Sequence, residues 1–158
     1  DPSYNDVGLV IAGAKGWLCD DLFKEANVRT SGVRRTPDVS NSQIIFTGQI
    51  RDEERFLYYK SADIFVYPSF FEGFGFPPLE AMKCGTPVIA SRNSSFPEVL
   101  GNAAVLVDPY DVGELKLWMG RLLEDNNLKK TLSARGQKRA SLFDWKITAQ
   151  KTLECLVK

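Results

Sequence analysis

The chain has 158 residues, and its 20 basic and 20 acidic side chains cancel to a formal net charge of zero. This length fits one domain, and the composition (44% hydrophobic, 25% charged) is ordinary for a soluble globular protein. The charge balance creates no global field that would attract nucleic acid or a membrane surface. Histidine is absent, which excludes a Ser-His-Asp or Cys-His catalytic group and any histidine metal site within the sequence.

The cysteines and the hydropathy pattern indicate where the protein works. Cys19, Cys84 and Cys155 are scattered and show no C-x-x-C spacing, so they predict neither a disulfide framework nor a zinc site. No apolar run reaches the length of a transmembrane helix, and no secretory signal opens the chain. We therefore expect a cytoplasmic protein.

The first apolar run, residues 7–13, predicts a buried parallel strand. Lys15 follows between two glycines and could touch a phosphate, although a solvated loop lysine explains it equally well. A helix is expected through residues 22–26, and the polar stretch 27–41 is expected to be an exposed loop.

A second strand is predicted at residues 44–48, and a helix begins near Asp52, a residue type that favours the N-cap. Gln49 and Ile50 lie in the turn between them. Arg51 could reach a nucleotide base or phosphate, or it could be a surface residue at the start of the helix.

Residues 64–91 have the order of a strand, a glycine-containing loop, a short helix and another strand. The strands are expected at 64–67 and 87–90, and the helix starts at Pro77 and Pro78 and ends before Gly85. In open α/β sheets, ligands bind outside the carboxyl ends of the strands, which is where this loop is expected to lie.

The loop carries groups suited to a sugar–phosphate–sugar ligand. Gly73 and Gly75 lack Cβ atoms, so the backbone can approach a ligand closely. Backbone N–H groups and the positive end of the following helix favour a phosphate. Glu72 and Glu80 flank this position, and carboxylates accept hydrogen bonds from sugar hydroxyls. A nucleotide sugar has this composition.

Less specific readings of the same residues remain open. Glu80 could simply be a first-turn carboxylate that faces the helix dipole, and Glu72 could be a solvated loop charge. Among the phenylalanines, some of Phe70, Phe71, Phe74 and Phe76 are expected in the core, and only Phe74 and Phe76 are expected to line the site.

The last strand is expected at residues 104–107, and Asp111 with Glu114 has the spacing of a capping box. Three apolar stripes then predict core-facing helices, the last within residues 144–158. The stripes are Val112, Leu115, Trp118, Met119 and Leu122; Leu128, Leu132, Gly136, Ala140 and Phe143; and Ala149, Leu153 and Leu156. Strands that alternate with helices predict an α/β fold with a Rossmann-like, doubly wound parallel sheet, finished by C-terminal helices.

The central stretch resembles the donor-binding signature of retaining GT-B glycosyltransferases of family 4 (group 1). The signature has two glutamates around a G-F-G loop, followed by L-E-A-M-x-x-G-x-P-V-I-A-S. The sequence has Glu72, then Gly73, Phe74 and Gly75, and then residues 79–91 in the matching pattern. The flanks at 61–69, 97–99 and 106–109 match as well, and the resemblance runs from about residue 7 to the end.

The resemblance implies a role for each matching position. Glu72 would be the catalytic carboxylate that orients the donor sugar, and Glu80 would bind the ribose. Gln49 and Ile50 would contact the base through backbone groups. The donor sugar and phosphates would be contacted by Gly73, Phe74, Gly75 and Phe76, with Lys15 and Arg51 as further phosphate candidates and Arg92 as a weaker one.

The resemblance covers only the second of the two Rossmann-like domains of a GT-B enzyme. We expect residues 1–158 to form a single nucleotide-sugar-binding domain that lacks its first strand and helix and the whole N-terminal acceptor domain. Such a domain is expected to be inactive alone. In the GT-B fold the last helix commonly returns to the first domain, so residues 147–156 are expected to be partly exposed here. The full enzyme would use no metal or other cofactor, would act on a saccharide or glycolipid acceptor, and would associate peripherally with the inner face of the membrane.

Two other classes of protein share parts of this pattern. A dinucleotide-binding oxidoreductase should show G-x-G-x-x-G after the first strand, but Gly8, Gly13 and Gly16 stand there instead. A non-catalytic nucleotide- or sugar-binding module is the closer alternative, and a preceding Rossmann-like domain in the same gene distinguishes an enzyme from such a module.

Overall fold

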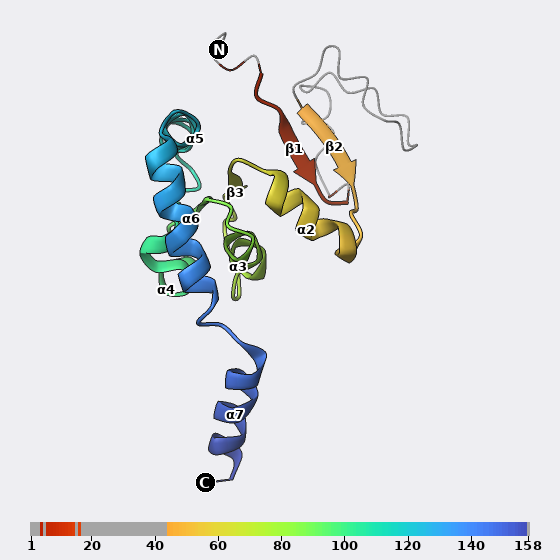
Figure 1. Ribbon diagram of the computed structural model, residues 1–158, viewed down its shortest axis with the longest axis vertical. Coiled ribbons are helices and arrows are strands. Elements are labelled where there is room, and N and C mark those ends of the chain that lie inside the picture. The colour runs from red at the N-terminus through yellow and green to blue at the C-terminus, as the bar shows by residue number, and fades with distance from the viewer. Residues whose placement is uncertain (1–3, 5, 15, 17–43, 158) are drawn as a thin grey trace. The chain divides into compact units, whose positions relative to one another are not determined.

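The computed structural model describes residues 4, 6–14, 16 and 44–157. The chain divides into two compact units, residues 1–54 and 55–158, and each is described here by itself (Figure 1). Lys15, the helix expected at 22–26 and the loop expected at 27–41 lie outside the described residues.

The first unit contains two parallel strands. β1 (Leu9–Ala12) pairs with β2 (Ile44–Gly48), with Leu9 opposite Ile44 and a shift of register between Ile11 and Ala12. Both strands were predicted from their apolar runs. Helix α2 (Asp52–Ser61) begins at the expected Asp52 and continues into the second unit.

The second unit is built on a three-stranded parallel sheet in the order β3-β4-β5. These strands are Phe65–Tyr67, Val88–Ser91 and Val105–Val107. Helix α3 (Phe76–Lys83) connects the first pair, and α4 (Phe96–Leu100) with the short 3₁₀ helix Gly101–Ala103 connects the second pair. The predicted α/β class with parallel strands is confirmed, although the described strands form two sheets rather than one.

The central strand β4 is buried on both faces because helices cover each side of the sheet. Its four residues are fully buried. Val88 and Ala90 join the core with α3 and α4, whereas Ile89 joins a second core with Leu122 of α5 and Leu132 of α6. This division follows from the two-residue period of a strand, which points successive side chains to opposite faces.

Residue types at both ends determine the extent of α3. A proline stands within its first two positions, where a missing N–H loses no intrahelical bond. At the other end, Gly85 has a φ of +85°. Its N–H donates to Met82 O and the N–H of Thr86 donates to Ala81 O, at 3.0 Å each. This is a Schellman ending, which requires the left-handed conformation that glycine adopts without strain.

Two helices pack on the sheet after β5. They are α5 (Val112–Glu124) and α6 (Asn126–Ala140). The Asp111 side chain accepts the Glu114 N–H at 2.9 Å, as the capping box predicts. The Glu114 carboxylate, however, accepts from the N–H of Asp108 at 2.7 Å. The apolar stripes of both helices are confirmed except at Val112 and Phe143, which are exposed because they lie at the outer ends of their stripes.

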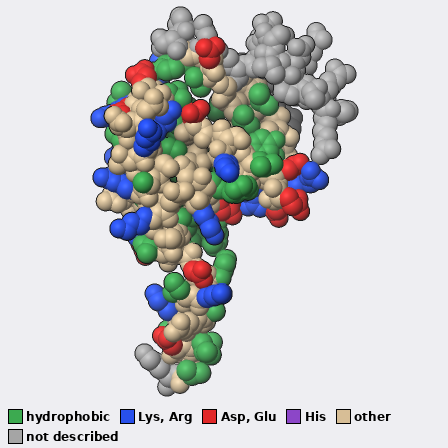
Figure 2. Space-filling view, viewed as in Figure 1, with side chains coloured by type: hydrophobic (Ala, Val, Ile, Leu, Met, Phe, Trp, Pro, Cys, Tyr) green, Lys and Arg blue, Asp and Glu red, His purple; other side chains and the backbone are tan. Residues whose placement is uncertain are grey.

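The third stripe does not pack in the core of the second unit, and the exposure that the resemblance implies for residues 147–156 is found. Helix α7 (Trp145–Leu156) has no buried residue, and Leu153 and Leu156 are exposed. Hydrophobic side chains of α7 accordingly appear at the surface in Figure 2. The periodicity predicts the helix correctly, but no described residue of the second unit buries Leu153 or Leu156.

Among the described residues, we find no helix with the length and apolar character needed to cross a membrane.

The packing of α5 can be tested with two leucines of the same helix. Leu122 is fully buried against β4 and β5, whereas Leu117 is 66% exposed. We expect Leu122→Ala to lower the free energy of unfolding by about 2–5 kcal/mol because it removes buried methyl groups and leaves a cavity. Leu117→Ala should change it by about 0.5 kcal/mol or less. Urea denaturation followed by circular dichroism measures both, and equal losses would contradict the proposed packing of α5.

Candidate functional site

The glycine loop connects the carboxyl end of β3 to the start of α3. Gly75 is the N-cap of α3, with φ +100° and ψ +51°. A Cβ atom at this position would lie 2.5 Å from Cε1 of Phe96, a fully buried ring of α4. Both the backbone conformation and the close approach of this ring therefore require glycine at residue 75.

The turn of residues 93–95, which follows β4, holds the glycine loop by side-chain hydrogen bonds. Asn93 Nδ2 donates to Phe70 O at 2.9 Å. The backbone N–H of Glu72 donates to Ser94 Oγ at 3.2 Å. Ser95 Oγ donates to Phe74 O at 2.9 Å and lies 3.3 Å from Glu72 O. Three consecutive polar residues thus fix the loop on both sides of Glu72.

Ser94 adopts a left-handed conformation with φ +48°, the one positive φ of a non-glycine residue among those described. Such a conformation is strained for an L-residue and is often found at functional sites. Here it places the Ser94 hydroxyl against the backbone of Glu72.

The Glu72 carboxylate is held through one of its two oxygens. Tyr67 OH and Ser69 Oγ each donate to Oε1 at 2.9 Å. Oε2 has no hydrogen bond to any residue that the structure describes, so it can accept from a ligand hydroxyl. Burial first, and then the hydrogen bond and charge of Glu72, raise the pKa of Tyr67 to about 12. Tyr67 therefore remains a neutral donor at physiological pH.

Glu80 lies on α3, and α2 supplies the groups that hold it. Tyr59 OH donates to Glu80 Oε2 at 3.0 Å, and Arg55 Nη1 lies 3.3 Å from the same oxygen. Burial, followed by the charge and hydrogen bond of Glu80, raises the pKa of Tyr59. The Glu80 side chain is 41% exposed, so its carboxylate is oriented by two partners and still reachable from solvent.

The start of α3 offers few backbone N–H groups that could donate hydrogen bonds to a phosphate. Pro77 and Pro78 carry no N–H, so among the first three residues of α3 only Phe76 has one. The preceding loop adds the N–H groups of Gly73, Phe74 and Gly75. The expected backbone contact with a phosphate therefore rests on the residues before the prolines rather than on the helix itself.

The expectation that some of the four loop phenylalanines are core residues is wrong, because all four are exposed. Phe74 and Phe76 contact each other, with ring centroids 4.8 Å apart. Their rings also meet Phe143 and Trp145, at 5.8 Å and 6.0 Å. The short loop has no room to turn large rings inward, since its inner side is occupied by Phe96 and the 93–95 turn.

The structure brings Glu72, the G-F-G-F residues and Glu80 together in the second unit. Gln49, Ile50 and Arg51 belong to the first unit, so their contacts with a base or phosphate stay predictions. Gln49 is exposed and Ile50 is half-buried. Glu54 accepts a hydrogen bond from the Arg51 guanidinium, which raises the pKa of Arg51.

Arg92, the weaker phosphate candidate, forms an ion pair with Glu114 at 3.2 Å. Within the described part of the chain, no group of three or more His, Cys, Asp or Glu side chains is placed to hold a metal ion.

Sequence reasoning missed the residues that orient the two carboxylates. Arg55 and Tyr59 are four positions apart on α2, a spacing that places both on one helix face, and this could have indicated a shared partner. Tyr67 ends a strand next to the loop, where a polar hydroxyl could have been noted. The role of residues 93–95 depends on a contact between segments about 20 positions apart and has no local sequence signal.

The chain belongs to the family of group 1 glycosyl transferases, whose pattern it matches over residues 2–139. The O-antigen chain mannosyltransferase B of Escherichia coli is 36% identical over 147 residues, which are 92% of this chain and 36% of that protein. The MMP alpha-(1->4)-mannosyltransferase of Mycolicibacterium hassiacum is 40% identical over 117 residues, 71% of this chain and 28% of that protein. The matched residues thus cover only 36% and 28% of the lengths of these two relatives.

Solved structures show the same fold. Sucrose-phosphate synthase from Thermosynechococcus elongatus matches with a TM-score of 0.75 and 29% identity, over 94% of this chain and 37% of that chain. The C-terminal domain of a glycosyl transferase group 1 family protein (LpcC) from Francisella tularensis matches with a TM-score of 0.69 and 26% identity, over 89% of this chain and 71% of that chain.

Two neighbouring glycines test whether the loop geometry is required. Gly75 has φ +100° and faces Phe96, whereas a Cβ on Gly73 would meet no atom within 4 Å. Gly75→Ala should lower the free energy of unfolding by about 1–3 kcal/mol because a left-handed alanine is strained and its methyl displaces a buried ring. Gly73→Ala should change it by about 0.5 kcal/mol or less. The measurement is denaturant unfolding, and a tolerated Gly75→Ala would contradict this geometry.

The Tyr67–Glu72 hydrogen bond predicts a pH-dependent effect. Tyr67→Phe should lower the free energy of unfolding by about 1–2 kcal/mol at neutral pH, since a hydrogen bond to a carboxylate is lost. The folded-state pKa of Tyr67 is raised to about 12 from 10.0, so its contribution is complete below pH 10 and is lost as the pH rises toward 12. The difference between the two proteins should therefore stay constant from pH 7 to about 9.5 and change above about pH 10. Unfolding curves at several pH values measure it; a constant difference up to the highest pH would refute the assignment.

Proposed function

We propose that the chain is the donor-binding half of a metal-independent, retaining glycosyltransferase of the GT-B type, family 4. The full enzyme would transfer a sugar from a nucleotide-diphosphate sugar, with UDP or GDP as the nucleotide, to a saccharide or lipid-linked acceptor. Family membership and the mannosyltransferase relatives support this proposal. The observation that carries it is a pair of carboxylates, Glu72 and Glu80, which flank the glycines of the loop. A tyrosine hydroxyl orients each of them.

Glu72 would orient the donor sugar. Its Oε1 already accepts two hydrogen bonds, from Tyr67 and Ser69, so only Oε2 is available to sugar hydroxyls. One carboxylate oxygen with a fixed direction can select one orientation of a sugar ring. Such positioning lowers the barrier to transfer because the reacting groups are held in place before reaction.

The leaving nucleoside diphosphate gains negative charge as the glycosidic bond breaks, and fixed donors must stabilise that charge. The backbone N–H groups of residues 73–76 would supply part of this stabilisation. Lys15 and Arg51 remain candidates for the rest, together with groups from a preceding domain. That domain would also carry the acceptor site, and the relatives' greater length supports its existence.

A hydrolase-like arrangement of two acids suits this site poorly. A two-carboxylate mechanism needs one acid at the glycosidic oxygen and one carboxylate at the anomeric carbon. Glu80 instead contacts Arg55 and Tyr59 on α2, which supports a binding role, such as accepting hydrogen bonds from ribose hydroxyls. Action in the cytoplasm, at the inner face of a membrane, is part of the proposal by analogy with the family.

The two carboxylates form a matched pair for a binding experiment. Ligand-observed NMR on the 158-residue chain with UDP, GDP, ADP and their sugar conjugates should show binding of one nucleotide. Glu80→Gln should weaken that nucleotide about tenfold, since a hydrogen bond to a charged group is worth about 1.5–3 kcal/mol. Glu72→Gln should leave the free nucleotide unaffected and weaken only the preference for its sugar conjugate.

The outcomes separate the two assignments. Nucleotide binding that survives Glu80→Gln would move the ribose site elsewhere. Equal effects of both substitutions on the free nucleotide would contradict the division into a ribose-binding and a sugar-binding carboxylate. No binding of any nucleotide by a folded chain would contradict a donor site within these residues.

A further inference from the structure

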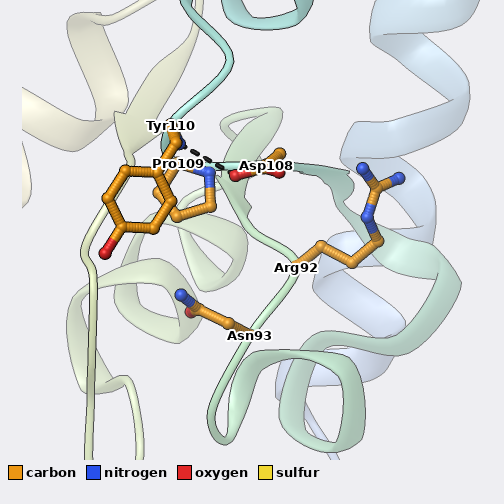
Figure 3. Close-up of a pocket in the computed structure, with 5 residues that line it drawn as sticks. All are labelled: Arg92, Asn93, Asp108, Pro109 and Tyr110. Carbon is orange, nitrogen blue, oxygen red and sulfur yellow. Dashed lines mark hydrogen bonds between the residues drawn. The ribbon is translucent and has the colours of Figure 1, made fainter.

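A hollow lies at the carboxyl ends of β4 and β5, beside the glycine loop. It measures about 270 Å³ and is lined by Arg92, Asn93, Asp108, Pro109 and Tyr110 (Figure 3). Sites for drug-sized ligands measure about 300–1,000 Å³. This hollow therefore suits a single ring rather than a whole nucleotide, and it takes no part in the donor contacts proposed above.

Among the described residues, Arg92 is the one cationic residue that lines the hollow, and its charge is neutralised by Glu114. Arg92 and Asn93 are consecutive, and their side chains point in opposite directions (Figure 3). The Arg92 guanidinium pairs with Glu114 at 3.2 Å, and Glu114 also accepts the N–H of Asp108 at 2.7 Å. An anionic ligand such as phosphate would therefore meet Asp108 and a neutralised arginine, which does not favour its binding.

Two side-chain oxygens of the lining residues Asn93 and Asp108 have no hydrogen-bond donor among the described residues. Asn93 Nδ2 is used by Phe70 O, whereas Asn93 Oδ1 is buried and has no hydrogen-bond partner among the described residues. Asp108 Oδ1 accepts the N–H of Tyr110 at 2.9 Å, and Asp108 Oδ2 has no partner within the same part of the chain. Asp108 is exposed, so a ligand hydroxyl can donate to its free Oδ2, whereas Asn93 Oδ1 is closed to a ligand by its burial.

An exposed aromatic surface adjoins these acceptors. Tyr110 is 78% exposed and Phe70 is 61% exposed. Their rings stack on each other, with centroids 4.9 Å apart and an interplanar angle of 26°. A mutually supported pair of rings keeps a fixed orientation although both rings face solvent. Such a surface can cover the apolar C–H face of a ring whose rim carries polar groups.

From these observations we propose that the hollow with the Phe70–Tyr110 pair is a binding subsite for a neutral pyranose ring of a saccharide. The aromatic pair would cover one face of the ring, and the exposed Asp108 carboxylate would accept from its hydroxyls through Oδ2. Phe70 is two residues from Glu72, so a ring bound here lies on the same loop as the donor-sugar carboxylate. Saccharide binding in the hollow does not depend on the donor site proposed above.

Saturation-transfer NMR on the 158-residue chain tests the subsite, with mannobiose as the probe and inorganic phosphate as the anionic comparison. Mannobiose should bind and phosphate should not. Tyr110→Ala should weaken mannobiose about three- to tenfold, as expected for the loss of an aromatic contact. Tyr110→Phe keeps the ring and should bind normally. Phe56→Ala removes an exposed ring of α2 outside the hollow and should also bind normally.

The same samples are titrated with the nucleotide identified above, and their amide spectra confirm folding. Nucleotide binding without mannobiose binding would overturn the subsite and leave the donor site standing. A chain that binds mannobiose but no nucleotide would contradict the donor-site proposal. If Tyr110→Ala then abolished mannobiose binding, the subsite would still be supported. Mannobiose binding equal in wild type and Tyr110→Ala, or phosphate binding weakened by Tyr110→Ala, would also overturn the subsite.

Discussion

The contact between the glycine loop and the 93–95 turn is the constraint on which the candidate site depends. Phe96 approaches Gly75 so closely that no side chain fits, and Asn93, Ser94 and Ser95 bind the loop backbone on both sides of Glu72. These residues follow β4, the strand buried on both faces. The position of the Glu72 carboxylate is therefore linked to the most buried part of the second unit rather than to the loop alone.

A tyrosine holds each of the two glutamates, and Arg55 adds an ion pair at Glu80. A tyrosine hydroxyl donates to each of them, Tyr67 from the end of β3 and Tyr59 from α2. Burial raises the pKa of both tyrosines, so each remains a donor throughout the physiological range. At Glu72 both donors are neutral hydroxyls, so they orient the carboxylate without cancelling its charge and leave Oε2 a strong acceptor for a ligand hydroxyl.

Much of the fold was predictable because its signals are local. The apolar runs at β2, β3 and β4, the glycine after α3 and the cap at Asp111 each determine a boundary through nearby residues. The predictions of burial that failed depend on which other segments pack against a residue, and local sequence patterns do not show this. The stripe of α7 predicted a helix correctly but could not show what covers it, and exposure of the loop phenylalanines follows from the space taken by Phe96. The Tyr59 hydroxyl that holds Glu80 comes from 21 positions away and needed the structure, whereas Tyr67 and Ser69 lie within five positions of Glu72.

The ends of α3 have a consequence for the entropy of ligand binding. Prolines at its start and the left-handed Gly85 at its end leave the helix no alternative length or register. The separation of Glu72 and Glu80 is therefore determined before any ligand arrives, because the loop between them is anchored as well. A ligand that meets both carboxylates does not have to order them, so less of its interaction energy is lost to conformational entropy. Because the distance between the two carboxylates is fixed, the site would select ligands by the spacing of their hydroxyl groups as well as by their chemistry.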